Sequence, residues 1–140
     1  MNRRKARENA FIAMFESSFG ADMGEIIATS RDEGHEYAVD AYGEDLLRLY
    51  ALHAEDIDKA IEAKLTGWKV GRLPRVNLAI LRLAITEMTY GEPDMDSVVI
   101  NEAVELTKKY ADEGDHQFVN GVLGNLSREK ATPPAPTPEV

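Results

Sequence analysis

Residues 73–90, LPRVNLAILRLAITEMTY, constrain the fold more than any other stretch of this chain. Placed on a helix at about 100° per residue, the apolar side chains surround the axis almost completely and leave only a narrow polar strip. Such a helix needs cover from other helices, because its apolar surface cannot face water. Two arginines, an asparagine and a glutamate argue against a membrane span. The stretch therefore predicts the central helix of a bundle, begun by Pro74 and ended by Gly91.

Two polar residues, Glu87 and Asn77, fall on the buried side of this helix. Each projects among apolar side chains of neighbouring turns. Because a buried carboxylate without donors is unfavourable, we expect Glu87 to accept hydrogen bonds from a neighbouring helix. A structural bond of this kind is favoured over a role as general acid or base.

The rest of the chain shows helical patterns and no strand pattern. The sequence predicts an all-α domain over residues 1–130, in which Asp96 or Ser97 can cap the helix that follows the central one. Residues 131–140 contain four prolines and are expected to form a disordered tail. About seven helices are expected, at roughly 2–17, 22–28, 41–52, 55–65, 73–90, 98–111 and 116–126.

Three further residues bear on packing. Trp68, in the linker before the central helix, is interpreted as a hydrophobic plug rather than as a binding aromatic. Gly121 and Gly124 lie inside the last helix, where each glycine costs about 1 kcal/mol relative to alanine. Two such costs indicate either close packing against another helix or a surface that must admit a partner.

The composition argues against several classes of chemistry. The chain has no cysteine, and its three histidines are scattered without ligand spacing, so neither thiolate chemistry nor a metal site is expected. The sequence contains no glycine-rich phosphate loop and no nucleophile elbow. We therefore expect no enzyme activity and no cofactor. The lack of a signal-peptide pattern and of a membrane segment predicts a cytoplasmic protein.

Charge is distributed unevenly along the chain. The first seven residues carry four cations and no acid, whereas the remaining 133 residues carry a formal net charge of −13. Arg3, Arg4 and Arg7 continue the packing side of the first helix, so their guanidinium groups should extend past the core into water over a groove. This asymmetry indicates an anion-binding arm on an acidic body. A solvated helix end is the alternative interpretation.

Four motifs, in this order, resemble the NusB family of bacterial transcription antitermination factors. They are RRKAR with EN-A after it, RVNLAILRLAITEM, VVINEAVELTKKY and HQFVNGVL. The resemblance covers about residues 2–126 and implies a NusB-like bundle of two packed helical subdomains. It also implies binding of single-stranded boxA RNA together with NusE, a small-subunit ribosomal protein, in the transcription elongation complex on ribosomal RNA operons.

The resemblance further implies which residues bind. Arg3, Arg4 and Arg7 occupy the positions of the family's arginine-rich motif and are RNA-binding candidates. Phe118 stands where the family presents an aromatic beside the RNA, and a place in the core is an equally weighted alternative. The candidates for a junction between RNA and partner are Asn77, where the family usually has an acid, and Arg82.

Two hypotheses of different classes follow. The first is an RNA-binding adaptor that holds boxA together with NusE. The second is a protein interaction module, for example a homodimer that covers its own arginine face. The clustered arginines favour the first hypothesis, and the acidic body permits either.

Overall fold

A computed structural model describes residues 2–32 and 34–131 of the chain. Within these residues the fold consists of α-helices and one 3-10 turn, without a strand, so the all-α prediction is confirmed. The elements are α1 (Arg3–Ser17), α2 (Met23–Ser30), α3 (Ala41–Glu62), η1 (Val70–Arg72), α4 (Arg75–Tyr90), α5 (Asp96–Tyr110) and α6 (Asp115–Ala131).

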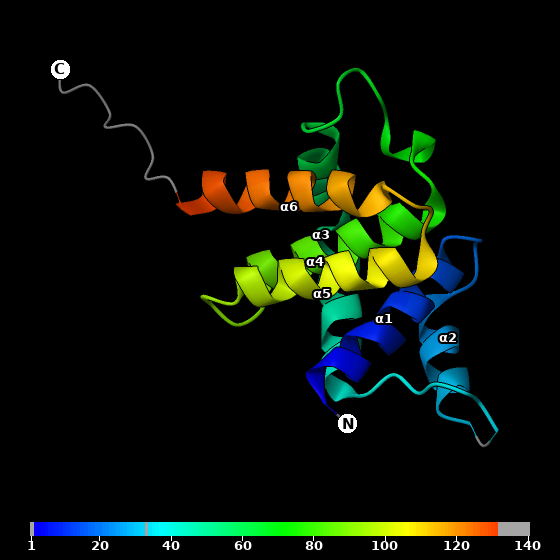
Figure 1. The fold of residues 1–140 in the computed structure, drawn as a ribbon. Helices are drawn as coiled ribbons and strands as arrows, with labels where there is room; N and C mark the ends of the chain where they lie inside the picture. Colours follow the sequence, from blue (N-terminus) through cyan, green and yellow to red (C-terminus); the bar gives the residue numbers. More distant parts are fainter. Residues whose placement is uncertain (1, 33, 132–140) are drawn as a thin grey trace, which may run out of the picture.

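Helix α4 is the central helix that the apolar pattern predicts. It packs against α1, α3, α5 and α6, and Figure 1 shows it inside the bundle with α6 on one side and α1 and α2 on the other. From Asn77 to Met88, every side chain except that of Arg82 is buried. No helix of the described part is both long enough and apolar enough to cross a membrane.

Helix α3 takes the place of the two helices expected at 41–52 and 55–65. Only His53 leaves helical geometry, with φ −117° and ψ 19°. No glycine or proline separates the two segments, so the helix bends at His53 without ending. The His53 ring stacks on Tyr90 of α4 with 3.9 Å between ring centroids, which holds the bend against the central helix.

Helices α5 and α6 differ from the expectation at their ends. Helix α5 begins at Asp96 without a side-chain cap. The Asp96 carboxylate instead accepts hydrogen bonds from Ser127 Oγ at 2.8 Å and from Lys130 Nζ at 2.7 Å, both on α6. Helix α6 continues to Ala131, and the rest of the proline-rich tail, 132–140, lies outside the described residues.

Close packing does not explain the glycines of α6. A Cβ atom at Gly121 would meet nothing within 4 Å, and one at Gly124 would meet only Nη1 of Arg128, at 3.3 Å. The alternative of a surface that admits a partner therefore remains. The interpretation of Trp68 as a hydrophobic plug is wrong, since this residue is 58% exposed.

Candidate nucleic-acid interface

Arg7 and Glu87 form a buried ion pair that joins α1 to α4. Arg7 Nε donates to Glu87 Oε1, and Nη2 donates to Oε2, each at 2.8 Å. The hydroxyl of Tyr42, on α3, donates to the same carboxylate. Glu87 is 3% exposed, so the expectation that it is buried and hydrogen-bonded is confirmed. The planar guanidinium suits this role because it can bond both carboxylate oxygens at once.

The expectation that Arg7 extends into water is wrong, because only 6% of the residue is exposed. Its side of α1 faces α4, where the Glu87 carboxylate needs a charged donor. The hydrogen bond with Glu87 raises the pKa of the Arg7 guanidinium. Burial, together with the bond to Glu87, raises the pKa of Tyr42 to about 12. Arg7 therefore holds α1 on the central helix.

Arg3 and Arg4 stay at the surface, with side chains 55% and 70% exposed. The Arg3 guanidinium lies over the Tyr42 ring, 3.7 Å from its centre, and 3.6 Å from the Glu92 carboxylate. Arg4 donates from Nε and from Nη2 to Glu102 of α5, each at 3.0 Å, and this bond raises the pKa of Arg4. Both arginines thus have carboxylate partners that a ligand's phosphate would have to replace.

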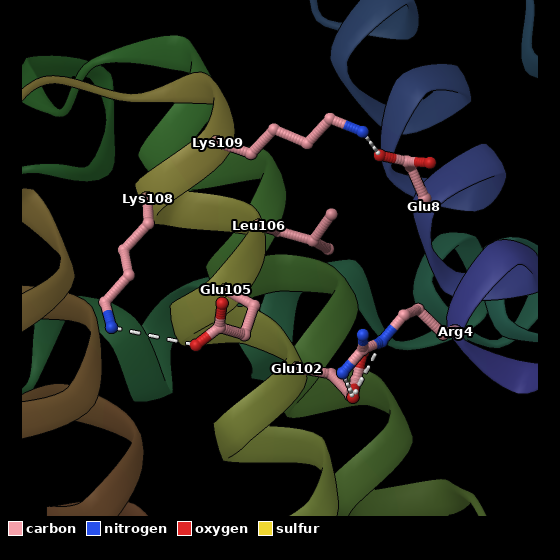
Figure 2. Close-up of a pocket in the computed structure, with 7 residues that line it drawn as sticks. All are labelled: Arg4, Glu8, Glu102, Glu105, Leu106, Lys108 and Lys109. Atoms are coloured by element: carbon pink, nitrogen blue, oxygen red, sulfur yellow. Dashed lines mark hydrogen bonds and ion pairs between the residues drawn. The ribbon is translucent and has the colours of Figure 1, made fainter.

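A groove of about 390 Å³ lies between α1 and α5. Figure 2 shows Lys109 extended across it to Glu8, at 2.6 Å, while Lys108 turns away from α1 toward Glu105. The bond from Lys109 is the main cause of the low pKa of Glu8, about 2. Acids and cations balance in this groove, so it is not strongly positive. Its lining consists of Arg4, Glu8, Glu102, Glu105, Leu106, Lys108 and Lys109.

Phe118 and Asn77 meet at a second groove, of about 400 Å³, between the linker, α4 and α6. Phe118 is half-buried and packs against the core while it lines this groove. Asn77 is 3% exposed, and its side-chain oxygen has no hydrogen-bond partner. The lining is mainly apolar and consists of Leu65, Thr66, Trp68, Leu73, Pro74, Asn77, Asp115 and Phe118.

Arg82 lies apart from this second groove. Its Nε and Nη2 atoms donate to the carboxylate of Asp58, on α3, at 3.0 and 2.9 Å. Its guanidinium lies 5.4 Å from the centre of the Tyr50 ring. The fold thus brings Phe118 and Asn77 together, but it places Arg82 in an ion pair between α3 and α4.

A row of aromatic rings extends along α1 and just past its end, and the sequence pattern was not used to predict it. Phe11, Phe15 and Phe19 follow one another with ring centroids 6.4 and 5.1 Å apart, and Tyr110 of α5 lies 5.0 Å from Phe11. The guanidinium of Arg75, at the start of α4, lies 4.6 Å from the Phe19 ring centre and donates to a backbone carbonyl just after α1. The four-residue spacing of the phenylalanines is the signal that could have predicted this row.

The chain is similar to known proteins over most of its length. Residues 4–128 match the NusB family. A transcription antitermination protein NusB from Clostridium novyi is 40% identical over 130 residues, which cover 90% of this chain and 98% of that relative. The protein of the same name from Bacillus mycoides is 38% identical over 128 residues, which cover 90% and 97% of the two chains.

Solved structures share the fold. NusB of T. maritima has a TM-score of 0.83 at 30% identity and covers 92% of each chain. A crystal structure of the antitermination factors NusB and NusE in complex with dsRNA contains a similar chain, with a TM-score of 0.77 at 30% identity. That similarity covers 91% of this chain and 96% of the other.

Proposed function

This chain belongs to the NusB family of transcription antitermination proteins, and we propose that it binds boxA RNA together with NusE during transcription of ribosomal RNA operons. A similar chain that forms a complex with NusE and dsRNA supports the proposal. In this role the protein is a cytoplasmic adaptor within the transcription elongation complex and catalyses no reaction.

The observation that carries the proposal is the exposure of two guanidinium groups at the start of α1. Arg3 and Arg4 have side chains 55% and 70% exposed. The Glu92 side chain is 63% exposed and that of Glu102 is 13% exposed, and ion pairs made by exposed arginines contribute little to stability. A phosphate can therefore replace Glu92 or Glu102 at little cost. Arg7 differs, because a phosphate that drew it away from Glu87 would leave this carboxylate buried without a charged donor.

The second groove offers contacts to the bases of the RNA, which the arginines do not read. Phosphate contacts position a strand without reading its sequence, whereas bases are read by stacking and by hydrogen bonds to their edges. Phe118 offers a half-buried ring, and Asn77 offers an amide whose oxygen lacks a partner. We therefore place a base of boxA on Phe118, next to Asn77.

The test is the affinity of the protein for fluorescently labelled boxA RNA, measured by anisotropy with and without NusE over a range of salt concentrations. Changing Arg3 and Arg4 together to alanine should make the slope of log affinity against log salt shallower by about 1.4, since each phosphate contact contributes about 0.7. The matched control is Arg48→Ala, which removes an exposed arginine that is also paired with a carboxylate. Phe118→Ala should cost about 1 to 3 kcal/mol and leave the slope unchanged.

Binding of boxA by the double variant as tight as that of the parent protein, in the presence of NusE, would contradict the proposal. The protein interaction module, or a homodimer that covers the arginine face, would then be the better hypothesis. A sedimentation measurement of the free protein distinguishes these two outcomes, because a homodimer has twice the mass of the monomer.

A further inference from the structure

Tyr42, in the first turn of α3, carries the Arg3 side chain on its ring. Helices α1 and α3 pack against each other, and Figure 1 shows the start of α3 beside the start of α1. Tyr42 is half-buried and packs against the core, whereas Arg3 is exposed. The Cζ atom of Arg3 lies 3.7 Å from the centre of the ring. Carbon atoms in contact are about 3.5 to 4.0 Å apart, so the face of the guanidinium, rather than an N–H group, contacts the ring.

This contact leaves the hydrogen-bond donors of Arg3 free. A guanidinium stacks through its face and donates hydrogen bonds within its plane. The Glu92 carboxylate is 3.6 Å away, which is too far for a hydrogen bond, and within residues 2–32 and 34–131 the Arg3 side chain makes none. Arg4, by contrast, already donates from Nε and Nη2 to Glu102. A phosphate can therefore bond Arg3 without breaking a hydrogen bond of this side chain.

The ring of Tyr42 is itself held in place by the buried ion pair. Its hydroxyl donates to the Glu87 carboxylate, which also accepts two hydrogen bonds from Arg7. Burial, together with the bond to Glu87, raises the pKa of Tyr42 to about 12, so the hydroxyl keeps its proton at neutral pH. An exposed arginine loses rotamer freedom when it binds a ligand. A fixed ring under Arg3 reduces this loss, because it restricts the side chain before the ligand arrives.

We propose that Tyr42 is a positioning residue for RNA binding: its ring holds the Arg3 guanidinium in place to receive a phosphate of the RNA. The inference rests on the proposed function and deepens it, since it gives a residue of α3 a part in the RNA contact of α1. Arg3 covers the ring face that it contacts, so a base cannot stack on that face at the same time. Tyr42 therefore acts through Arg3, and its ring should matter for binding only while Arg3 is present.

Two variants of Tyr42 separate its ring from its hydroxyl. Tyr42→Phe and Tyr42→Leu both remove the bond to Glu87, so both should lower the urea unfolding midpoint. Only Tyr42→Leu also removes the ring. Tyr42→Phe should bind labelled boxA RNA as tightly as the parent protein does. Tyr42→Leu should weaken binding about twofold to fivefold, the range for one exposed contact between a cation and a ring. Anisotropy measures the affinity, and circular dichroism verifies that each variant is folded under the same conditions.

A double-mutant cycle tests whether Tyr42 acts through Arg3. RNA affinity is measured for Arg3→Ala, for Tyr42→Leu and for both changes together. The double variant should bind as Arg3→Ala alone does, because a ring without its arginine positions nothing. Tyr37→Leu is the matched control: it removes another half-buried tyrosine that packs against the core, in the loop before α3, and should leave RNA affinity unchanged.

The outcomes separate this inference from the proposed function. Weaker boxA binding by Arg3→Ala, together with parent-like binding by Tyr42→Leu, would overturn the positioning role and leave the proposed function intact. Equal losses of RNA affinity for Tyr42→Phe and Tyr42→Leu would also overturn it, since binding would then depend on the hydroxyl. A loss for Tyr42→Leu that persists beside Arg3→Ala would overturn it and make the ring itself a contact of the RNA. The expected coupling on a scrambled strand, with no preference for boxA even beside NusE, would support the positioning role and contradict the proposed function.

Discussion

The buried pair of Arg7 and Glu87 gives the sharpest prediction for stability. Glu87→Gln keeps the size of the side chain but leaves the Arg7 charge buried without a carboxylate. Both residues are at most 6% exposed, and the carboxylate accepts bonds from Arg7 and Tyr42. Removal of one member of a buried pair typically costs about 3 to 5 kcal/mol. For a domain of this length, that loss corresponds to a fall in Tm of roughly 10 to 20 °C.

The measurement is urea unfolding followed by far-ultraviolet circular dichroism, in which the midpoint should fall while the m-value stays constant. Arg4→Ala is the matched control, since it removes the pair of an exposed arginine with Glu102 and should lower the urea midpoint much less than Glu87→Gln does. In the double variant Arg7→Met with Glu87→Met, the loss should be smaller than the sum of the two single losses, because neither charge remains unpaired. Additive losses, or a loss below about 1 kcal/mol for Glu87→Gln, would refute the proposed coupling of α1 to α4.

Two further predictions concern α1 and α6. The hydrogen bond from Lys109 is the main reason why the pKa of Glu8 is lowered from 4.5 to about 2. Ionised Glu8 therefore stabilises the fold above about pH 4.5, and this contribution is lost as the pH falls toward 2. Glu8→Gln should reduce the acid sensitivity of urea unfolding between neutral and acidic pH, and an unchanged pH dependence would contradict this. Gly121→Ala should stabilise the protein by about 1 kcal/mol, because the new methyl group meets nothing within 4 Å. A urea unfolding midpoint no higher than that of the parent protein would show that Gly121 does not destabilise α6.

The central helix could be predicted because its evidence is local. Apolar residues around the whole axis of 73–90 require cover, and α4 is buried from Asn77 to Met88 except at Arg82. The hydrogen-bonded state of Glu87 followed from the same burial. The continuous α3 could not be separated from two shorter helices, since the bend at His53 depends on its stacking with Tyr90, a contact distant in sequence.

The site residues were harder to predict, because Arg3, Arg4 and Arg7 look alike in the sequence. Only the packing of α1 on α4 sends Arg7 to Glu87 and leaves the other two at the surface. Trp68 was misjudged for a related reason. Its exposure depends on where the linker lies relative to α6, and no periodic pattern reports the position of a linker.

RNA that binds at the start of α1 must displace carboxylates from the two surface arginines. Arg3 and Arg4 already bind Glu92 and Glu102, so a phosphate that takes their place leaves two carboxylates unpaired on a chain with a formal net charge of −9. At the start of α1, the gain in RNA affinity is therefore the difference between two anions, and each of these arginines should contribute less than an arginine without a carboxylate partner would.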